Sequence, residues 1–142
     1  MGTLYEADFV AWAKEQAALL RSGNLTDIDA LRIAEEIESI GRRERNEMQS
    51  RIAVLLAHLL KWQFQPERRG PSLEAIIKLQ RCYISTLLRD SPSLTSAFYD
   101  ENFLESIWLH ATVVAGEQTI LDMPGTWIWP LDVVLDDSFW PE

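Results

Sequence analysis

Five charged or titratable side chains recur at helical spacing in the middle of the sequence: Glu36, Arg43, Glu47, Arg51 and His58. Separations of seven, four, four and seven residues place them near one side of a helix. If that side faces solvent, its ion pairs contribute only about 0.2–0.5 kcal/mol each. If it faces the bundle or a cleft, the charges must be paired, because burying an unpaired charge is costly. Such a cleft would bind a polar ligand or a partner's side chain.

A second group of candidate binding residues follows in the segment KWQFQPERRG. Arg68 and Arg69 stand directly before the next expected helix, and a guanidinium group can hold a carboxylate or a phosphate through two parallel hydrogen bonds. Gln63 lies between two aromatic residues of this segment and is a further candidate. Adjacent arginines in a loop are common, so the pair alone is weak evidence for a binding site.

The same helix allows an alternative in which the protein is an enzyme. His58 could exchange protons together with one of three carboxylates on the helix, which are Glu36, Glu44 and Glu47. Those carboxylates could also collect a divalent ion with oxygens from the helix that begins at Leu73. However, the sequence has one cysteine, two histidines, no HxxxH pair and no Gly-rich phosphate loop. We assign no catalytic residue, metal or cofactor, and favour a noncatalytic interaction or accessory role.

One long helix is expected to carry the polar face. Apolar residues between positions 33 and 62 recur in steps of mostly three or four. Asp27 or Asp29 can serve as the N-cap, and Pro66 prevents the helix from continuing much further. Its length of roughly 50 Å exceeds the roughly 35–40 Å expected across a globule of this size. The helix therefore either bends near Gly41 or belongs to an elongated domain.

Further helices are expected on both sides of this helix. Thr3 and Glu6 fit a capping box for the first helix, and Ser72 is a good cap for the helix after the long one. The remaining periodic segments and proline positions predict helices over about residues 4–21, 73–89, 94–99, 101–121 and 131–135. The sequence thus predicts an all-α fold, a single-domain bundle of about five or six helices over residues 1–142.

The C-terminal segment, residues 123–142, is rich in tryptophan. Burying each of its aromatic rings contributes roughly 2–3 kcal/mol, so these rings are not expected to stay in solvent. We expect the segment to dock on the bundle of its own chain, with docking on another chain as the alternative. Among single residues, we interpret Cys82 as a small buried hydrophobe and His110 as a packed or surface residue.

The net charge of −9 opposes nonspecific attraction to nucleic acid or to an anionic membrane. Residues 1–31, 32–69 and 70–142 carry net charges of −3, +2 and −8. The basic middle of one chain could meet the acidic end of another, so we expect a homo-oligomer or a protein partner. Base stacking on Trp62 and Phe64 is a less favoured alternative. The sequence shows no signal peptide and no apolar run of about 18 residues, which favours a cytoplasmic protein.

Four sequence motifs resemble a known protein family: EEIESIGRRER, HLLKWQFQPERR, DSPSL and the terminal DDSFWPE. Over residues 5–140 the chain is similar to the bacterial family catalogued as domain of unknown function twenty-nine, known largely from cyanobacteria and some proteobacteria. The matching residues are Glu35, Glu36, Gly41, Arg51, Leu60, Lys61, Trp62, Gln63, Pro66, Glu67 and Arg68. The resemblance implies an all-helical single domain. It implies no activity, because the family has no established function.

Overall fold

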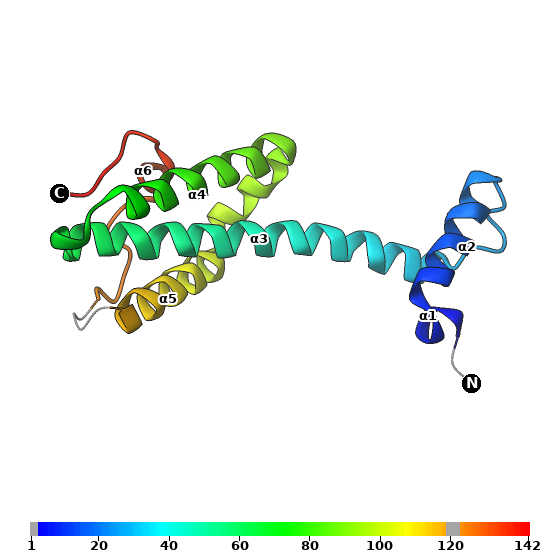
Figure 1. Cartoon of the computed structure of the whole chain (residues 1–142). Coiled ribbons are helices and arrows are strands. Elements are labelled where there is room, and N and C mark those ends of the chain that lie inside the picture. The colour runs from blue at the N-terminus through cyan, green and yellow to red at the C-terminus, as the bar shows by residue number, and fades with distance from the viewer. Residues whose placement is uncertain (1–2, 119–122) are drawn as a thin grey trace. The chain divides into compact units, whose positions relative to one another are not determined.

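The computed structural model describes residues 3–118 and 123–142, and every regular element within them is a helix, which confirms the all-α fold. The elements are α1 (Leu4–Ala7), α2 (Phe9–Arg21), α3 (Ala30–Phe64), η1 (Pro66–Arg68), α4 (Pro71–Asp90), η2 (Pro92–Tyr99), α5 (Glu101–Gln118) and α6 (Leu131–Leu135), where η marks a 3₁₀-helix (Figure 1). The chain divides into two compact units, one ending at Arg42 and the other beginning at Arg43. That both units belong to one domain stays a prediction.

The first unit corrects the expected N-terminal helix. The single helix over residues 4–21 is wrong, because the chain leaves helical geometry at Asp8, with φ −153° and ψ 88°. The Asp8 carboxylate accepts a hydrogen bond from the Ala11 N–H at 3.1 Å and so begins α2. The expected capping box is also wrong. The Thr3 side chain makes no capping hydrogen bond, and the Glu6 carboxylate lies 3.7 Å from Arg32.

An aromatic cluster and a capping residue organise the rest of the first unit. The rings of Tyr5 and Trp12 meet edge to face, with centroids 4.8 Å apart. The buried Gln16 accepts a hydrogen bond from the Asp29 N–H at 2.7 Å. Asp29 in turn accepts from the Arg32 N–H at 3.4 Å, which confirms Asp29 as the residue that precedes and caps α3.

Helix α3 continues through Gly41 and ends at Phe64, before Pro66, as the sequence predicts. Its apolar positions differ in burial between the two units. In the first unit Ile37 is 64% exposed, although it continues the apolar stripe. In the second unit the stripe is fully buried at Ile52, Leu56 and Leu59.

The core of the second unit is formed where the later part of α3 packs with α4, α5, η2 and α6 (Figure 1). Its buried members are Met48, Ile52, Ala53, Leu55, Leu56, Ala57, Leu59, Leu60, Ile77, Ile84, Ala97, Phe103, Ile107, Trp108, Ala111, Ala115 and Val134. The expected end of α5 near residue 121 lies outside the described residues. Asp100 begins α5 by accepting from the Asn102 N–H at 3.0 Å, and it also binds Arg45 of α3 at 2.8 Å.

Two expectations about α4 are wrong. Its N-cap is Gly70 and not Ser72, because Pro71 occupies the first turn, where its fixed φ suits a helix and its missing N–H costs nothing. Cys82 is exposed and not buried. The core face of α4 passes through Ile77, Arg81 and Ile84, at helical spacings of four and three residues, so the neighbouring position 82 falls outside it.

The C-terminal segment docks on the bundle of its own chain, which confirms the expectation. The indole N–H of Trp127 donates to the Leu104 carbonyl at 2.9 Å, and that of Trp108 donates to the Pro124 carbonyl at 3.0 Å. Farther along, the ring of Trp140 lies 4.7 Å from that of Trp62.

His110 is exposed, in agreement with its interpretation as a packed or surface residue. Among the described helices, none has both the length and the apolar character that crossing a membrane requires.

Candidate functional site

A hollow of about 340 Å³ lies where α3 ends and α4 begins, and we call it the basic hollow. Pro66 ends α3, η1 turns the chain, and Pro71 starts α4, so the end of one helix and the start of the next share one surface. The residues that line the basic hollow are His58, Lys61, Gln65, Arg68, Ser72, Leu73 and Ile76.

The basic hollow carries positive charge with no lining carboxylate. In the described parts of the chain, no carboxylate lies within 4.0 Å of the Lys61 ammonium or the Arg68 guanidinium. Burial lowers the pKa of Lys61, and the nearby positive charge of Arg68 lowers it further. The two cations therefore repel each other, and an anion placed between them would relieve that repulsion.

His58 adds a titratable group to the basic hollow. Its Nδ1 lies 2.6 Å from the Val54 carbonyl oxygen, so Nδ1–H donates to that carbonyl and Nε2 is left for another partner. Partial burial lowers the pKa of the imidazole, an effect opposed by the bond to Val54 and reinforced by Lys61. A bound anion would oppose this effect, so the imidazole would gain a proton more readily beside it.

The first turn of α4 gives the basic hollow backbone donors. The first N–H groups of a helix have no intrahelical acceptor, and they carry the positive end of the helix dipole. Gly70, the N-cap, has no side chain to satisfy them. Ser72 and Leu73 stand in this turn and line the basic hollow. An anion there would meet both side-chain cations and backbone N–H groups.

Gln65 supplies the one unsatisfied acceptor in the lining. Gln65 is only 8% exposed, and its Oε1 is buried without a hydrogen-bond partner among the described residues. A buried acceptor without a donor is destabilising, so a ligand that brings an N–H or O–H group would restore the lost hydrogen bond. The sequence reading did not assign Lys61 or Gln65 to a common site with His58. The spacing of three and four residues between them could have revealed it, because it places all three on one face of α3.

The other candidate residues lie elsewhere. Glu36 belongs to the first unit, where it accepts a hydrogen bond from the Tyr5 hydroxyl and raises the pKa of that phenol. Glu47 and Arg51 form an ion pair at 3.2 Å, and Arg51 lies over the Tyr83 ring at 4.1 Å. Arg43 is exposed and Gln63 is half-buried.

Arg69 holds the C-terminal segment and does not line the basic hollow. Its Nε–H donates to the Trp62 carbonyl at 2.6 Å, and Nη2 lies 3.4 Å from the Pro141 carbonyl. Of the residues that we selected from the sequence, the structure brings only His58 and Arg68 together in this hollow.

The carboxylates considered for catalysis are not part of the basic hollow. Glu36, Glu44 and Glu47 are absent from its lining, and Glu36 lies in the other unit from His58. Among the described residues, no three His, Cys, Asp or Glu side chains are grouped so that they could hold a metal ion.

These features define an all-α protein with a cationic hollow between the end of one helix and the start of the next. The sequence matches the family described as "Domain of unknown function DUF29" over residues 4–140, and the chain belongs to that family. The match confirms the resemblance seen in the sequence motifs and attaches no activity to the chain. No curated protein and no solved structure matches this chain.

Proposed function

We propose that this protein is a noncatalytic helical interaction protein that binds an acidic segment of a protein partner in the basic hollow. The observation that carries the proposal is the pair of cations, Lys61 and Arg68, which have no carboxylate within ion-pairing distance in the described chain and no acidic residue beside them in the lining. A partner's carboxylate would accept from these side chains and from the first N–H groups of α4.

The unsatisfied Gln65 Oε1 favours a peptide over a simple anion. A carboxylate without N–H groups would neutralise the cations and still leave this acceptor without a donor. An extended peptide carries a backbone N–H within reach of each acidic side chain, so one segment could satisfy both requirements.

A second copy of the chain is one source of such a segment. Residues 70–142 carry a net charge of −8, whereas residues 32–69 carry +2, so the charges of two copies are complementary. We therefore include self-association in the proposal, alongside a different acidic protein. The setting that we propose is the bacterial cytoplasm. Nucleic acid is a weaker candidate, because the chain as a whole is acidic.

The proposal is tested by comparing three tagged full-length proteins in pull-downs from host lysate, each carried out with and without nuclease treatment: the wild type, Lys61→Gln/Arg68→Gln and Arg42→Gln/Arg43→Gln. The control pair removes two positive charges from the same basic stretch outside the basic hollow. We expect one stoichiometric protein to be retained by the wild type and the control and reduced roughly tenfold by the change at Lys61 and Arg68, as loss of charge-assisted hydrogen bonds predicts.

A synthetic peptide of the partner's acidic segment should then bind the same three proteins in the same order. Light scattering after size-exclusion chromatography tells whether the partner is a second copy. Equal retention by all three proteins would refute the role of the basic hollow. A species that is retained from untreated lysate but lost from nuclease-treated lysate would point to nucleic acid instead.

A further inference from the structure

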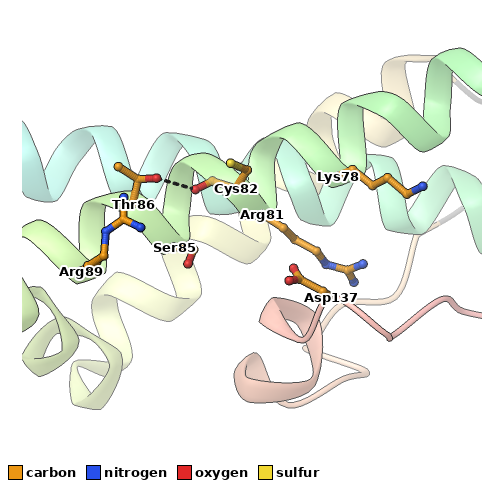
Figure 2. A pocket seen from close by; sticks show the side chains of 7 residues that line it. All are labelled: Lys78, Arg81, Cys82, Ser85, Thr86, Arg89 and Asp137. Carbon is orange, nitrogen blue, oxygen red and sulfur yellow. Dashed lines mark hydrogen bonds between the residues drawn. The ribbon is translucent and has the colours of Figure 1, made fainter.

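A second hollow, of about 410 Å³, lies on another face of α4 and has no role in the proposed function. Figure 2 shows its side chains, which come from successive turns of α4 and from Asp137 of the C-terminal segment. We call it the Arg81 hollow. Lys78, Arg81, Ser85 and Arg89 are separated by three, four and four residues, so they share one side of the helix.

Arg81 is the unusual residue of this hollow. It is only 3% exposed, and its Nε–H and Nη2–H groups donate to the carbonyls of Val134 at 3.1 Å and Phe139 at 2.8 Å. Nη1 is buried and has no hydrogen-bond partner in the part of the chain that the structure describes. Within the described residues, the guanidinium has two neutral carbonyls as hydrogen-bond partners and lies over the Trp140 ring at 5.6 Å from its centroid, and no carboxylate comes within 4.0 Å of it.

This arrangement leaves a buried positive charge incompletely compensated. Burial lowers the pKa of Arg81, while the more distant carboxylates of Asp137 and Asp136 act in the opposite direction. A buried charge is stabilised when it gains an opposite charge together with hydrogen bonds to its free donors. Nη1 has two such donors to offer.

The other lining groups indicate which anion would fit. Lys78 and Arg89 add two cations to Arg81, Ser85 adds a hydroxyl, and Asp137 is the one carboxylate in the lining. Three positive charges against one negative charge favour a doubly charged oxyanion over a single carboxylate. A tetrahedral phosphoryl group also offers several oxygens to donors that approach from different turns of the helix.

Two neighbouring carboxylates compete for these cations. Glu74 lies 2.7 Å from the Lys78 ammonium, and Asp90 lies 4.0 Å from Arg89 Nε. Both are exposed pairs within one helix, and such pairs contribute little. The long side chains of Lys78 and Arg89 can therefore turn toward an anion in the hollow at small cost.

The geometry points to the Arg81 hollow as a binding site for a phosphoryl group, either inorganic phosphate or the phosphate of a small ester. Arg81 Nη1–H, the Lys78 ammonium, the Arg89 guanidinium and the Ser85 hydroxyl donate to the phosphoryl oxygens. Because Arg81 also donates to the carbonyls of Val134 and Phe139, the bound phosphate holds the guanidinium in the orientation that keeps the C-terminal segment docked.

The test is a titration of the ¹⁵N-labelled full chain with inorganic phosphate at constant ionic strength, followed by NMR. We expect saturable shifts of the Ser85 and Arg89 amides and of the Arg81 Nε–H. Lys78→Gln and Arg89→Gln should each weaken binding roughly tenfold. Lys14→Gln removes an exposed lysine of α2 and should leave the affinity unchanged. Arg81→Gln should abolish the shifts. If the Arg81→Gln protein does not fold, Lys78→Gln and Arg89→Gln still decide the test, because both residues are exposed.

The remaining outcomes separate this site from the basic hollow and identify the source of the phosphoryl group. Lys61→Gln/Arg68→Gln should leave the shift of the Ser85 amide on phosphate addition unchanged, even if this variant no longer binds a protein partner. Tighter binding of glycerol phosphate than of inorganic phosphate would assign an ester as the ligand, and the reverse order would assign the free ion. Non-saturating shifts, equal shifts with chloride, or unchanged affinity in both Lys78→Gln and Arg89→Gln would overturn the inference.

Discussion

At the scale of single residues, His58 gives the basic hollow a dependence on pH. Burial lowers the pKa of its imidazole below the ordinary value of 6.5. The unfolded chain therefore takes up this proton at a higher pH than the folded protein does. Because protons then bind preferentially to the unfolded state, His58 makes the protein less stable as the pH falls from about 6.5 through the pKa of the folded state.

We expect the free energy of unfolding of the wild type to fall more steeply between pH 7.5 and pH 5 than that of His58→Gln. Urea unfolding at several pH values measures it. His110→Gln is the matched control, because His110 is exposed, and it should follow the wild type. Parallel curves for the wild type and His58→Gln would contradict the expectation. A bound acidic peptide should raise the pKa of His58, which NMR of the imidazole can follow.

At the scale of secondary-structure elements, the first unit shows how one short side chain divides a helix. The sequence analysis placed the N-cap at Thr3, whereas in the structure the Thr3 side chain makes no capping hydrogen bond and Asp8 makes one. An acceptor at Asp8 competes with continuation of the helix because it satisfies the Ala11 N–H directly. The break separates α1 from α2 while the rings of Tyr5 and Trp12 remain in contact.

Asp8→Ala should therefore destabilise the protein by about 1 kcal/mol, the usual cost of losing an N-cap. Thr3→Ala should change stability by much less, since the Thr3 side chain caps nothing. Urea unfolding followed by circular dichroism measures both values. A larger loss for Thr3→Ala than for Asp8→Ala would show that the capping box expected from the sequence forms in solution after all.

At the scale of the whole molecule, the C-terminal segment completes the core of the second unit. Val134 of α6 is fully buried, and Trp140 packs against Trp62 near the end of α3. Two arginines from other elements hold the segment by its carbonyl groups, Arg81 from α4 and Arg69 after η1. Residues nearly at the end of the chain are thus part of the structure that positions both hollows.

Trp140→Ala should cost about 2 kcal/mol of stability, because it removes a partly buried ring and its contact with Trp62. Tyr99→Ala is the control, since Tyr99 is 89% exposed and its loss should cost little. Chemical denaturation of both variants provides the comparison. Equal stability of the two would mean that the C-terminal segment is not docked in solution as the structure shows.

Local signals in the sequence determined the helical class and most helix limits. The helical spacing of apolar residues can be recognised from residues in neighbouring turns alone. Pro66, Pro71 and Pro92 limit helices through their effect on the backbone at their own positions. The burial of the tryptophan-rich segment also followed from its apolar area. Among the candidate residues, the shared face of His58 with Lys61 and Gln65 was readable in the same local way.

Only the tertiary structure decided which polar side chains are buried and what they bind. Arg81 and Cys82 are neighbours on α4, and the sequence favoured the thiol for the core, yet packing buries the guanidinium and exposes the thiol. The reason is that the partners of Arg81, the carbonyls of Val134 and Phe139, come from more than fifty residues away along the chain. No local pattern encodes such partners, and the same holds for the unsatisfied atoms of Gln65 and Arg81 that led to the two proposed sites.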